Sequence, residues 1–154
     1  MIVRPARVSD AERICELVNE YAERGLMLHR SLESVYRSLR SFLVAEDDGR
    51  VVGCAAVEVF WGDLAEIRSL AVAPDRRGGG IGAALADAAI RDAARLGISR
   101  LFALTYESGF FERFGFEIID RGLLPEKVWS VCLNCPKADA CDEIAMIRRI
   151  EDEA

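Results

Sequence analysis

The stretch from Leu64 to Leu85 constrains the fold more than any other part of this 154-residue chain. It begins with the apolar pattern of a strand, breaks at Pro74, and continues after a glycine-rich loop with apolar residues at helical spacing. The loop contains Arg77, Gly78, Gly79, Gly80 and Gly82. Backbone N–H groups at a helix N-terminus bind anions, and residues without a Cβ let the anion approach closely. This order of strand, loop and helix indicates a phosphate-binding site.

Two common phosphate-binding loops do not fit these residues. A P-loop requires Lys and then Ser or Thr after the last glycine, but Ala83 and Ala84 follow here. A dinucleotide-binding loop would place a third glycine at Ala83, and further parallel strands are scarce in the pattern. The motif that remains is Arg77-x-x-Gly80-x-Gly82 directly after a strand. An ordinary glycine-rich connection is the alternative interpretation.

This motif and its position resemble the acetyl-CoA loop of the GNAT family of N-acetyltransferases, whose pattern is Q/R-x-x-G-x-G/A. The resemblance implies that acetyl-CoA is a co-substrate. It also implies that the pantetheine arm pairs with backbone groups near Leu70 and Val72. The cofactor-binding residues that it predicts are Leu70, Ala71, Val72, Arg77, Gly78, Gly79, Gly80, Ile81, Gly82 and Ala83.

Length and charge narrow the classes of protein to consider. At 154 residues the chain has the size of one domain, so we expect a single domain over residues 1–154. The net charge of −6 argues against nucleic acid or an anionic membrane as the main partner. No apolar run approaches the roughly 20 residues of a membrane span, and the N-terminus has a strand pattern rather than that of a signal peptide. We therefore expect a cytoplasmic protein.

The rest of the chain alternates between strand and helix patterns. A capping box at residues 9–12 predicts a helix that ends near Gly25, and Ser31 is expected to cap a second, short helix. Strands are expected at 1–5, 42–45, 51–60, 64–72, 101–106, 117–119 and 144–149, with a hairpin turn at 47–49 and a short helix at 110–114. The GNAT resemblance implies an α/β (α+β) fold. Its mixed sheet would have about six to seven strands, splayed open between the strands at 64–72 and 101–106 and flanked by about four helices.

Three segments bear on the acceptor. Residues 28–31, 65–67 and 104–125 are similar to the acetyltransferase domain of bacterial N-acetylglutamate synthases, and 126–146 to a short, single-domain form of them. This resemblance implies acetylation of L-glutamate, the first step of arginine biosynthesis. Two alternatives stay open. One is the same fold acting on another amine, such as a protein N-terminus, a polyamine or an antibiotic. The other is a non-catalytic acetyl-CoA sensor or partner subunit.

Direct acetyl transfer to an amine requires a base and a stabilised oxyanion. Glu66 occupies the position that commonly serves as the base in the GNAT family, with a solvated strand carboxylate as the alternative. A backbone N–H near Leu70 is the expected oxyanion donor, again by resemblance. Many members protonate the leaving thiolate with a tyrosine, and Phe111 stands in its place here. With a thiol pKa of about 8.5, by analogy with cysteine, coenzyme A is expected to leave as the thiolate.

Glutamate carries two carboxylates, so the acceptor site should contain at least two cations. The candidates are Arg30 before the second helix, Arg68 two residues beyond Glu66 in the strand, and Lys127. Each of the three has the alternative of a solvated surface charge. Tyr106 is a further candidate for the acceptor side, with a core or rim position as its alternative.

The cysteines leave one segment unexplained. Cys132-x2-Cys135-x5-Cys141 has a spacing that could hold zinc, but the usual second C-x-x-C pair is missing, and we expect no metal. Cys15 and Cys54 are expected to be small buried residues. The edge strands of such a sheet also make a homodimer possible.

Overall fold

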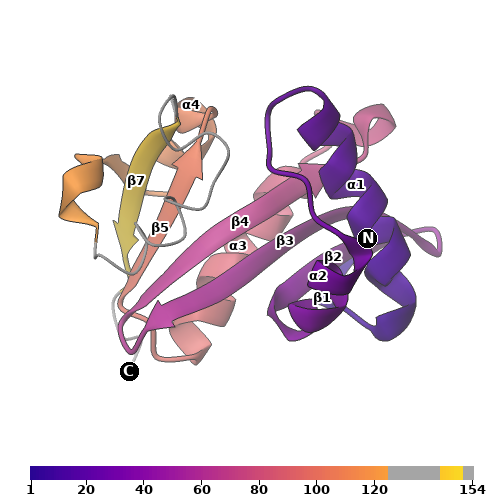
Figure 1. The fold of residues 1–154 in the computed structure, drawn as a ribbon, viewed down its shortest axis with the longest axis horizontal. Helices are drawn as coiled ribbons and strands as arrows, with labels where there is room; N and C mark the ends of the chain where they lie inside the picture. The colour runs from indigo at the N-terminus through magenta and orange to yellow at the C-terminus, as the bar shows by residue number, and fades with distance from the viewer. Residues whose placement is uncertain (125–142, 151–154) are drawn as a thin grey trace. The chain divides into compact units, whose positions relative to one another are not determined.

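The computed structural model describes residues 1–124 and 143–150. In these residues the elements follow one another as β1 (Ile2–Pro5), α1 (Ala11–Glu23), α2 (Leu32–Arg37), β2 (Phe42–Asp47), β3 (Arg50–Trp61), β4 (Leu64–Val72), α3 (Ile81–Arg95), β5 (Arg100–Thr105), α4 (Ser108–Glu112), β6 (Glu117–Ile118) and β7 (Ile144–Arg149) (Figure 1). The strand order in the sheet is β1-β2-β3-β4-β5-β7-β6. A mixed sheet with four α-helices in the described residues confirms the expected α/β class and the expected order of elements.

The directions of the strands make the sheet mixed. β2 is antiparallel to both β1 and β3, and β7 is antiparallel to both β5 and β6. Figure 1 shows β5 and β7 side by side, as their register of six residue pairs requires. β4 and β5 run parallel through the pairs Leu64↔Arg100, Ala65↔Leu101 and Glu66↔Phe102. The first part of β4 is therefore anchored to β5 by a short parallel register.

The chain divides into two compact units, which are described separately here. The first contains Met1–Glu58 and Ile67–Asp92, and the second contains Val59–Glu66 and the chain from Ala93 onward. In the first unit, α1 contributes an apolar stripe to the core, with Ile14, Leu17, Val18 and Tyr21 at most 7% exposed. Burial of each such side chain stabilises the fold by about 1.5–3 kcal/mol.

Close packing in the first unit also depends on a glycine in β3. A Cβ on Gly53 would lie 2.8 Å from Leu85 Cδ1 and 3.0 Å from Ile81 Cγ2, both in α3. A Cβ at this position would therefore require the Leu85 and Ile81 side chains to shift, and glycine lets the first turns of α3 approach β3 without this shift. The helix start that follows the glycine-rich loop is thereby seated against the sheet.

The core of the second unit is built around aromatic residues. Leu64 and Phe102 are fully buried, and the rings of Phe60 and Phe102 lie 5.5 Å apart. Phe111 in α4 is 6% exposed and packs edge-on against Phe110 and Phe116, with ring centroids 5.1 Å and 5.2 Å away. The residue at the family's tyrosine position is therefore part of an aromatic cluster.

Local details differ from the predictions at helix ends. The N-cap of α1 is Asp10, not Ser9, which lies in a short 3-10 helix (Val8–Asp10). The Asp10 carboxylate accepts from the Arg7 N–H at 2.7 Å and pairs with Arg4, so Asp10 closes the turn before the helix, and Ser9 is not the N-cap that the predicted capping box with Glu12 requires. Ser31 caps α2 as expected, with its Oγ accepting from the Ser34 N–H at 3.0 Å. Helix α4 begins two residues earlier than predicted, at Ser108.

The turn between β2 and β3 agrees with its prediction. Asp48 and Gly49 have φ values of 51° and 74°. Positive φ at two successive residues is typical of the tight turns that join antiparallel strands. Among the described residues, no helix is both long enough and apolar enough to cross a membrane.

Candidate functional site

The second half of β4 contains a strained residue. Ser69 has a φ of 55°, in the left-handed region that residues other than glycine rarely adopt. A residue in this conformation interrupts the regular pleat of a strand, and such strain concentrates at functional sites. The next residue is Leu70, whose N–H is the predicted oxyanion donor. Sequence reasoning missed Ser69 because a serine inside a strand pattern carries no signal of a positive φ.

The end of β4 is tied to α1. The Tyr21 hydroxyl donates to the Val72 carbonyl oxygen at 2.5 Å. The guanidinium carbon of Arg77 lies 5.5 Å from the centroid of the Tyr21 ring, within the range of a cation–π interaction. Pantetheine was expected to pair with backbone groups near Leu70 and Val72, and one of the two lone pairs of the Val72 carbonyl oxygen is already used by Tyr21. Sequence reasoning did not identify Tyr21 as a residue of the site, because its hydroxyl carries no sequence signal.

The glycine-rich loop has the backbone that the motif requires. Gly78 and Gly80 have φ values of 82° and 81°, and a Cβ on either would meet no atom within 4 Å. These glycines are therefore required for their conformation rather than for lack of space. Helix α3 begins directly afterwards, where the Ala84 N–H donates to the Gly80 carbonyl oxygen at 3.0 Å. The N–H groups of Ile81, Gly82 and Ala83 have no acceptor within the helix, and they suit a phosphate.

The start of the loop is held by two ion pairs to the β2–β3 hairpin. Arg76 pairs with Asp47, and Arg50 pairs with Asp75 at 3.2 Å. The hydrogen bond from Arg76 lowers the pKa of Asp47, and the bond from Arg50 lowers the pKa of Asp75. Both carboxylates are therefore ionised at neutral pH. Two arginines beside the loop are engaged by acids, whereas the Arg77 guanidinium lies over Tyr21.

Arg30, a predicted acceptor anchor, lies in the connection between α1 and α2. Its main chain is fixed by Asn19 of α1, which donates to the Arg30 carbonyl oxygen at 2.8 Å and accepts from the Arg30 N–H at 2.9 Å. Its side chain is only 9% exposed, and its guanidinium carbon lies 5.2 Å from the centroid of the Phe42 ring. The solvated-surface interpretation of Arg30 is therefore wrong.

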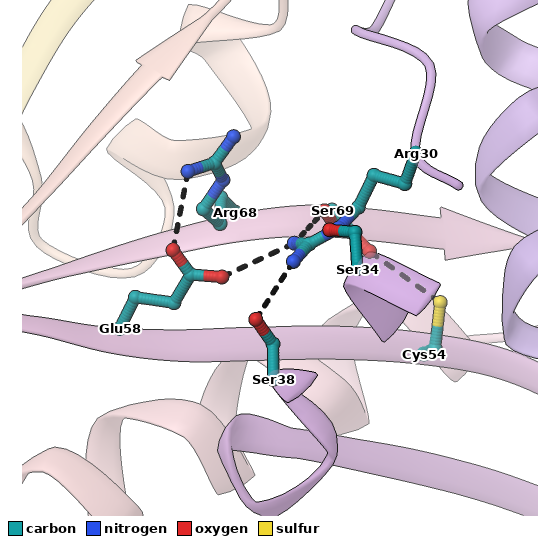
Figure 2. A network of polar contacts seen from close by, with 7 residues as sticks. All are labelled: Arg30, Ser34, Ser38, Cys54, Glu58, Arg68 and Ser69. Carbon is teal, nitrogen blue, oxygen red and sulfur yellow. Dashed lines mark hydrogen bonds and ion pairs between the residues drawn. The ribbon is translucent and has the colours of Figure 1, made fainter. Parts of the chain in front are cut away.

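The Arg30 guanidinium is at the centre of a polar network (Figure 2). Its Nη1 donates to Glu58 Oε1 at 3.1 Å and to Ser69 Oγ at 3.4 Å. Its Nη2 donates to Ser38 Oγ at 2.9 Å, and its Nε donates to Ser34 Oγ at 3.3 Å. A guanidinium has five N–H groups. Four of them are thus used by described residues, which leaves one on Nη2 for a ligand.

Arg68 joins the same network through Glu58. Arg68 Nη1 donates to Glu58 Oε2 at 3.1 Å, so one carboxylate contacts two of the predicted acceptor anchors (Figure 2). The network brings together the α1–α2 connection, α2, β3 and β4. Sequence reasoning found both arginines but missed Glu58, which has an ordinary polar position at the edge of the β3 pattern.

Two other predicted residues, Glu66 and Tyr106, belong to the second unit. Glu66 is 7% exposed in the part of β4 that belongs to the second unit, where it is paired in register with Phe102, so the solvated interpretation of this carboxylate is wrong. Tyr106 directly follows β5 in the same unit and is partly buried. Lys127 lies outside the described residues. The structure therefore brings together Arg30 and Arg68, while the roles of Glu66, Tyr106 and Lys127 stay predictions.

Of the two described cysteines, Cys54 is buried as expected, whereas the expectation of a buried Cys15 is wrong, because Cys15 is only partly buried and its S–H donates to the Arg30 carbonyl oxygen at 3.4 Å. Cys54 is fully buried, its S–H donates to the Ser69 carbonyl oxygen at 3.4 Å, and burial raises its pKa to about 12. A thiol with this pKa is protonated at neutral pH and is not a nucleophile. Within residues 1–124 and 143–150, no group of His, Cys, Asp and Glu could hold a metal ion. The segment with Cys132, Cys135 and Cys141 lies outside them.

Comparison with known proteins gives consistent matches. The family described as "Acetyltransferase (GNAT) family" matches residues 11–116. An uncharacterized N-acetyltransferase of Chlorobaculum tepidum is 44% identical over 148 residues, which cover 96% of this chain and 96% of that protein. An amino-acid acetyltransferase of Mycobacterium tuberculosis is 43% identical over 122 residues, which cover 77% of this chain and 70% of that protein.

A solved structure extends this similarity to three dimensions. N-acetylglutamate synthase from Neisseria gonorrhoeae, in complex with coenzyme A and N-acetyl-glutamate, matches with a TM-score of 0.89 and 33% identity. The match covers 97% of this chain and 35% of that chain, so this chain spans about a third of the length of the synthase.

Proposed function

Because this chain belongs to the GNAT family of acetyltransferases, we propose that its acceptor is the α-amine of L-glutamate. The chain is an acyltransferase that moves the acetyl group of acetyl-CoA to an amine, as its family and its amino-acid acetyltransferase relatives establish. The choice of glutamate is the proposal. It is supported by the N-acetyl-glutamate bound in the structurally similar synthase.

The observation that carries the proposal is the pair of arginines on Glu58. Arg30 and Arg68 are each within 3.1 Å of a different oxygen of this carboxylate. Guanidinium groups bind carboxylates through charge-assisted hydrogen bonds. A partly buried pair of them suits an acceptor that carries carboxylates and does not suit a polyamine, which is cationic. Lys127 is proposed as a further anchor for the second carboxylate of glutamate.

The mechanism that we propose assigns one role to each segment. Arg77 and the N–H groups of residues 78–83 bind the phosphates of acetyl-CoA, and the backbone of residues 70–72 binds its pantetheine arm. The amine nitrogen attacks the thioester carbon while Glu66, directly or through a water, takes its proton. The Leu70 N–H stabilises the oxyanion.

The last step of this mechanism breaks the carbon–sulfur bond. The tetrahedral intermediate collapses and expels coenzyme A as a thiolate, which needs no acid because a thiol of pKa about 8.5 is a good leaving group. Phe111, packed in its aromatic cluster, has no proton to give. Tyr106 is proposed to contact the acceptor. This chemistry would be carried by a single domain of residues 1–154, at the first step of arginine biosynthesis in the cytoplasm.

The experiment is a steady-state assay of coenzyme A release with the purified protein and a panel of acceptors. The panel contains the amino acids, spermidine and a peptide with a free N-terminus. L-glutamate should have the highest kcat/KM. Turnover of spermidine or the peptide without turnover of any free amino acid would overturn the proposed acceptor while leaving the acetyl-CoA chemistry intact.

A further inference from the structure

Glu58 has an unusual place among the charged residues of the acceptor region. It lies in β3, and its side chain is 21% exposed. Its two oxygens contact different arginines, with Oε1 at 3.1 Å from Arg30 Nη1 and Oε2 at 3.1 Å from Arg68 Nη1 (Figure 2). None of the roles in the proposed mechanism requires this carboxylate.

The Glu58 carboxylate bridges two positively charged side chains, those of Arg30 and Arg68. Two guanidinium groups repel each other, and a shared carboxylate between them offsets this repulsion. The bridge also limits the freedom of two long side chains, because both guanidinium groups are bound to the same carboxylate. With Glu58 in place, both guanidinium groups are therefore held at defined positions before an acceptor arrives.

The Arg30 guanidinium has several neutral hydrogen-bond partners besides Glu58. Three serine hydroxyls accept hydrogen bonds from the Arg30 guanidinium. They belong to Ser34 in α2, Ser38 at its C-terminal cap and Ser69 in β4. Neutral hydroxyls do not offset the charge of the arginine. Glu58 is the only described carboxylate in contact with the Arg30 guanidinium. Removal of the Glu58 charge would leave this cation without an anionic partner among the described residues.

We propose that Glu58 is a positioning residue for the acceptor. Its two oxygens hold the guanidinium groups of Arg30 and Arg68 as a fixed pair, which then receives a carboxylate of the amino acid. This inference rests on the proposed function, because it requires an acceptor with a carboxylate. A purely structural role for the same ion pairs would tie β3 to β4 and to the α1–α2 connection without affecting the acceptor selectively.

The test compares Glu58→Gln with Glu58→Asp and with a matched control, Glu33→Gln. Glu33 also pairs with an arginine, Arg37, at 2.9 Å, but on the exposed face of α2. The KM for L-glutamate, the KM for acetyl-CoA and kcat are measured for each protein. Glu58→Gln should raise the KM for L-glutamate about tenfold or more, the size of one lost charged hydrogen bond, with an unchanged KM for acetyl-CoA. Glu33→Gln should match the wild type.

The two variants at position 58 separate the charge of the side chain from its length. Aspartate keeps the charge but is too short to reach both arginines, so Glu58→Asp should also raise the KM for L-glutamate, though less than Glu58→Gln. Thermal unfolding with and without acetyl-CoA checks that each variant folds. If Glu58→Gln does not fold, the decision rests on Glu58→Asp.

Each remaining outcome overturns the inference in a distinct way. An unchanged or lowered KM for L-glutamate in the variants shows that Glu58 does not position the acceptor. An equal rise in the KM for acetyl-CoA indicates a structural role. If the wild type acetylates only amines without a carboxylate, the proposed function fails first and the inference fails with it, and this result is seen before any variant is made.

Discussion

A single side chain, that of Tyr21, connects α1 with the end of β4 and with the glycine-rich loop. Its hydroxyl bonds to the Val72 carbonyl oxygen, and its ring lies beneath the Arg77 guanidinium. The ring is also 5.9 Å from the guanidinium carbon of Arg24. Since Val72 and Arg77 flank the predicted donor site, the position of both depends on a residue that is itself only 7% exposed.

Replacement of Tyr21 by phenylalanine should therefore weaken acetyl-CoA binding. The change removes the hydrogen bond to Val72 and keeps the ring beneath Arg77, so the loss is about 1 kcal/mol, or about fivefold in the Kd for acetyl-CoA. Isothermal titration calorimetry measures this Kd. Tyr36→Phe, at a tyrosine of α2 that is 44% exposed, is the control. An unchanged Kd in Tyr21→Phe would show that this bond does not position the donor site.

Residues of the two sites differ in how far sequence reveals them. Arg77, Gly80 and Gly82 lie close together in the chain, and glycine indicates a backbone conformation that other residues rarely adopt. The motif could therefore be recognised in the sequence. Glu58 and Ser69 contact Arg30 from β3 and β4, which are separate elements. No local pattern records which side chains meet across strands, and this part of the site could not be predicted.

At the scale of elements, the glycine-rich loop joins a strand to a helix through two left-handed residues, Gly78 and Gly80. Between them lies Gly79, which does not have a positive φ, and a Cβ there would lie 3.5 Å from the Arg76 carbonyl oxygen, an ordinary contact. The three glycines look alike in the sequence but carry different backbone demands. This difference allows conformational strain to be tested with a matched pair of variants.

Gly80→Ala should lower the free energy of unfolding by about 1–2 kcal/mol, since an alanine at a φ of 81° is strained although no neighbouring atom is within 4 Å of its Cβ. Gly79→Ala adds the same methyl group and should leave the free energy of unfolding nearly unchanged. Urea denaturation without ligand measures both. Equal losses in the two variants would contradict the prediction, because they would show that the positive φ of Gly80 does not determine the need for glycine there.

Most elements were predictable because periodicity alone specifies them. The order from β1 to β7 and the limits of β4 agree with their predictions, since strands and helices differ in the spacing of buried residues. The start of α1 was not predictable. A capping box is a pattern of adjacent residues, whereas Asp10 is held by Arg4 of β1 and bridges back to the Arg7 N–H. Tertiary contacts therefore decide where this helix begins.

At the scale of the whole molecule, stability in acid should depend on the same aspartate. Asp10 is 7% exposed, and its two oxygens accept from Arg4 at 2.8 Å and 3.1 Å. The hydrogen bond from Arg4 lowers the pKa of Asp10 below its value of about 3.9 in an unfolded chain. The ionised carboxylate thus stabilises the folded state above that pH, and the contribution is lost as the pH falls through the lower pKa of the folded state.

Asp10→Asn should reduce the free energy of unfolding by about 2 kcal/mol at pH 7, because the charge-assisted bonds to Arg4 are lost. The difference between the variant and the wild type should be smaller at pH 2.5 than at pH 7, because the unfolded wild-type chain takes up a proton at Asp10 below a pH of about 3.9 and the stabilisation by the ionised carboxylate decreases. Urea denaturation at both pH values measures this change. Asp120→Asn is the control, since Asp120 accepts from the Gly122 N–H at 2.9 Å near the surface. A difference between Asp10→Asn and the wild type that is the same at both pH values would mean that the charge of Asp10 contributes nothing and that its packing matters instead.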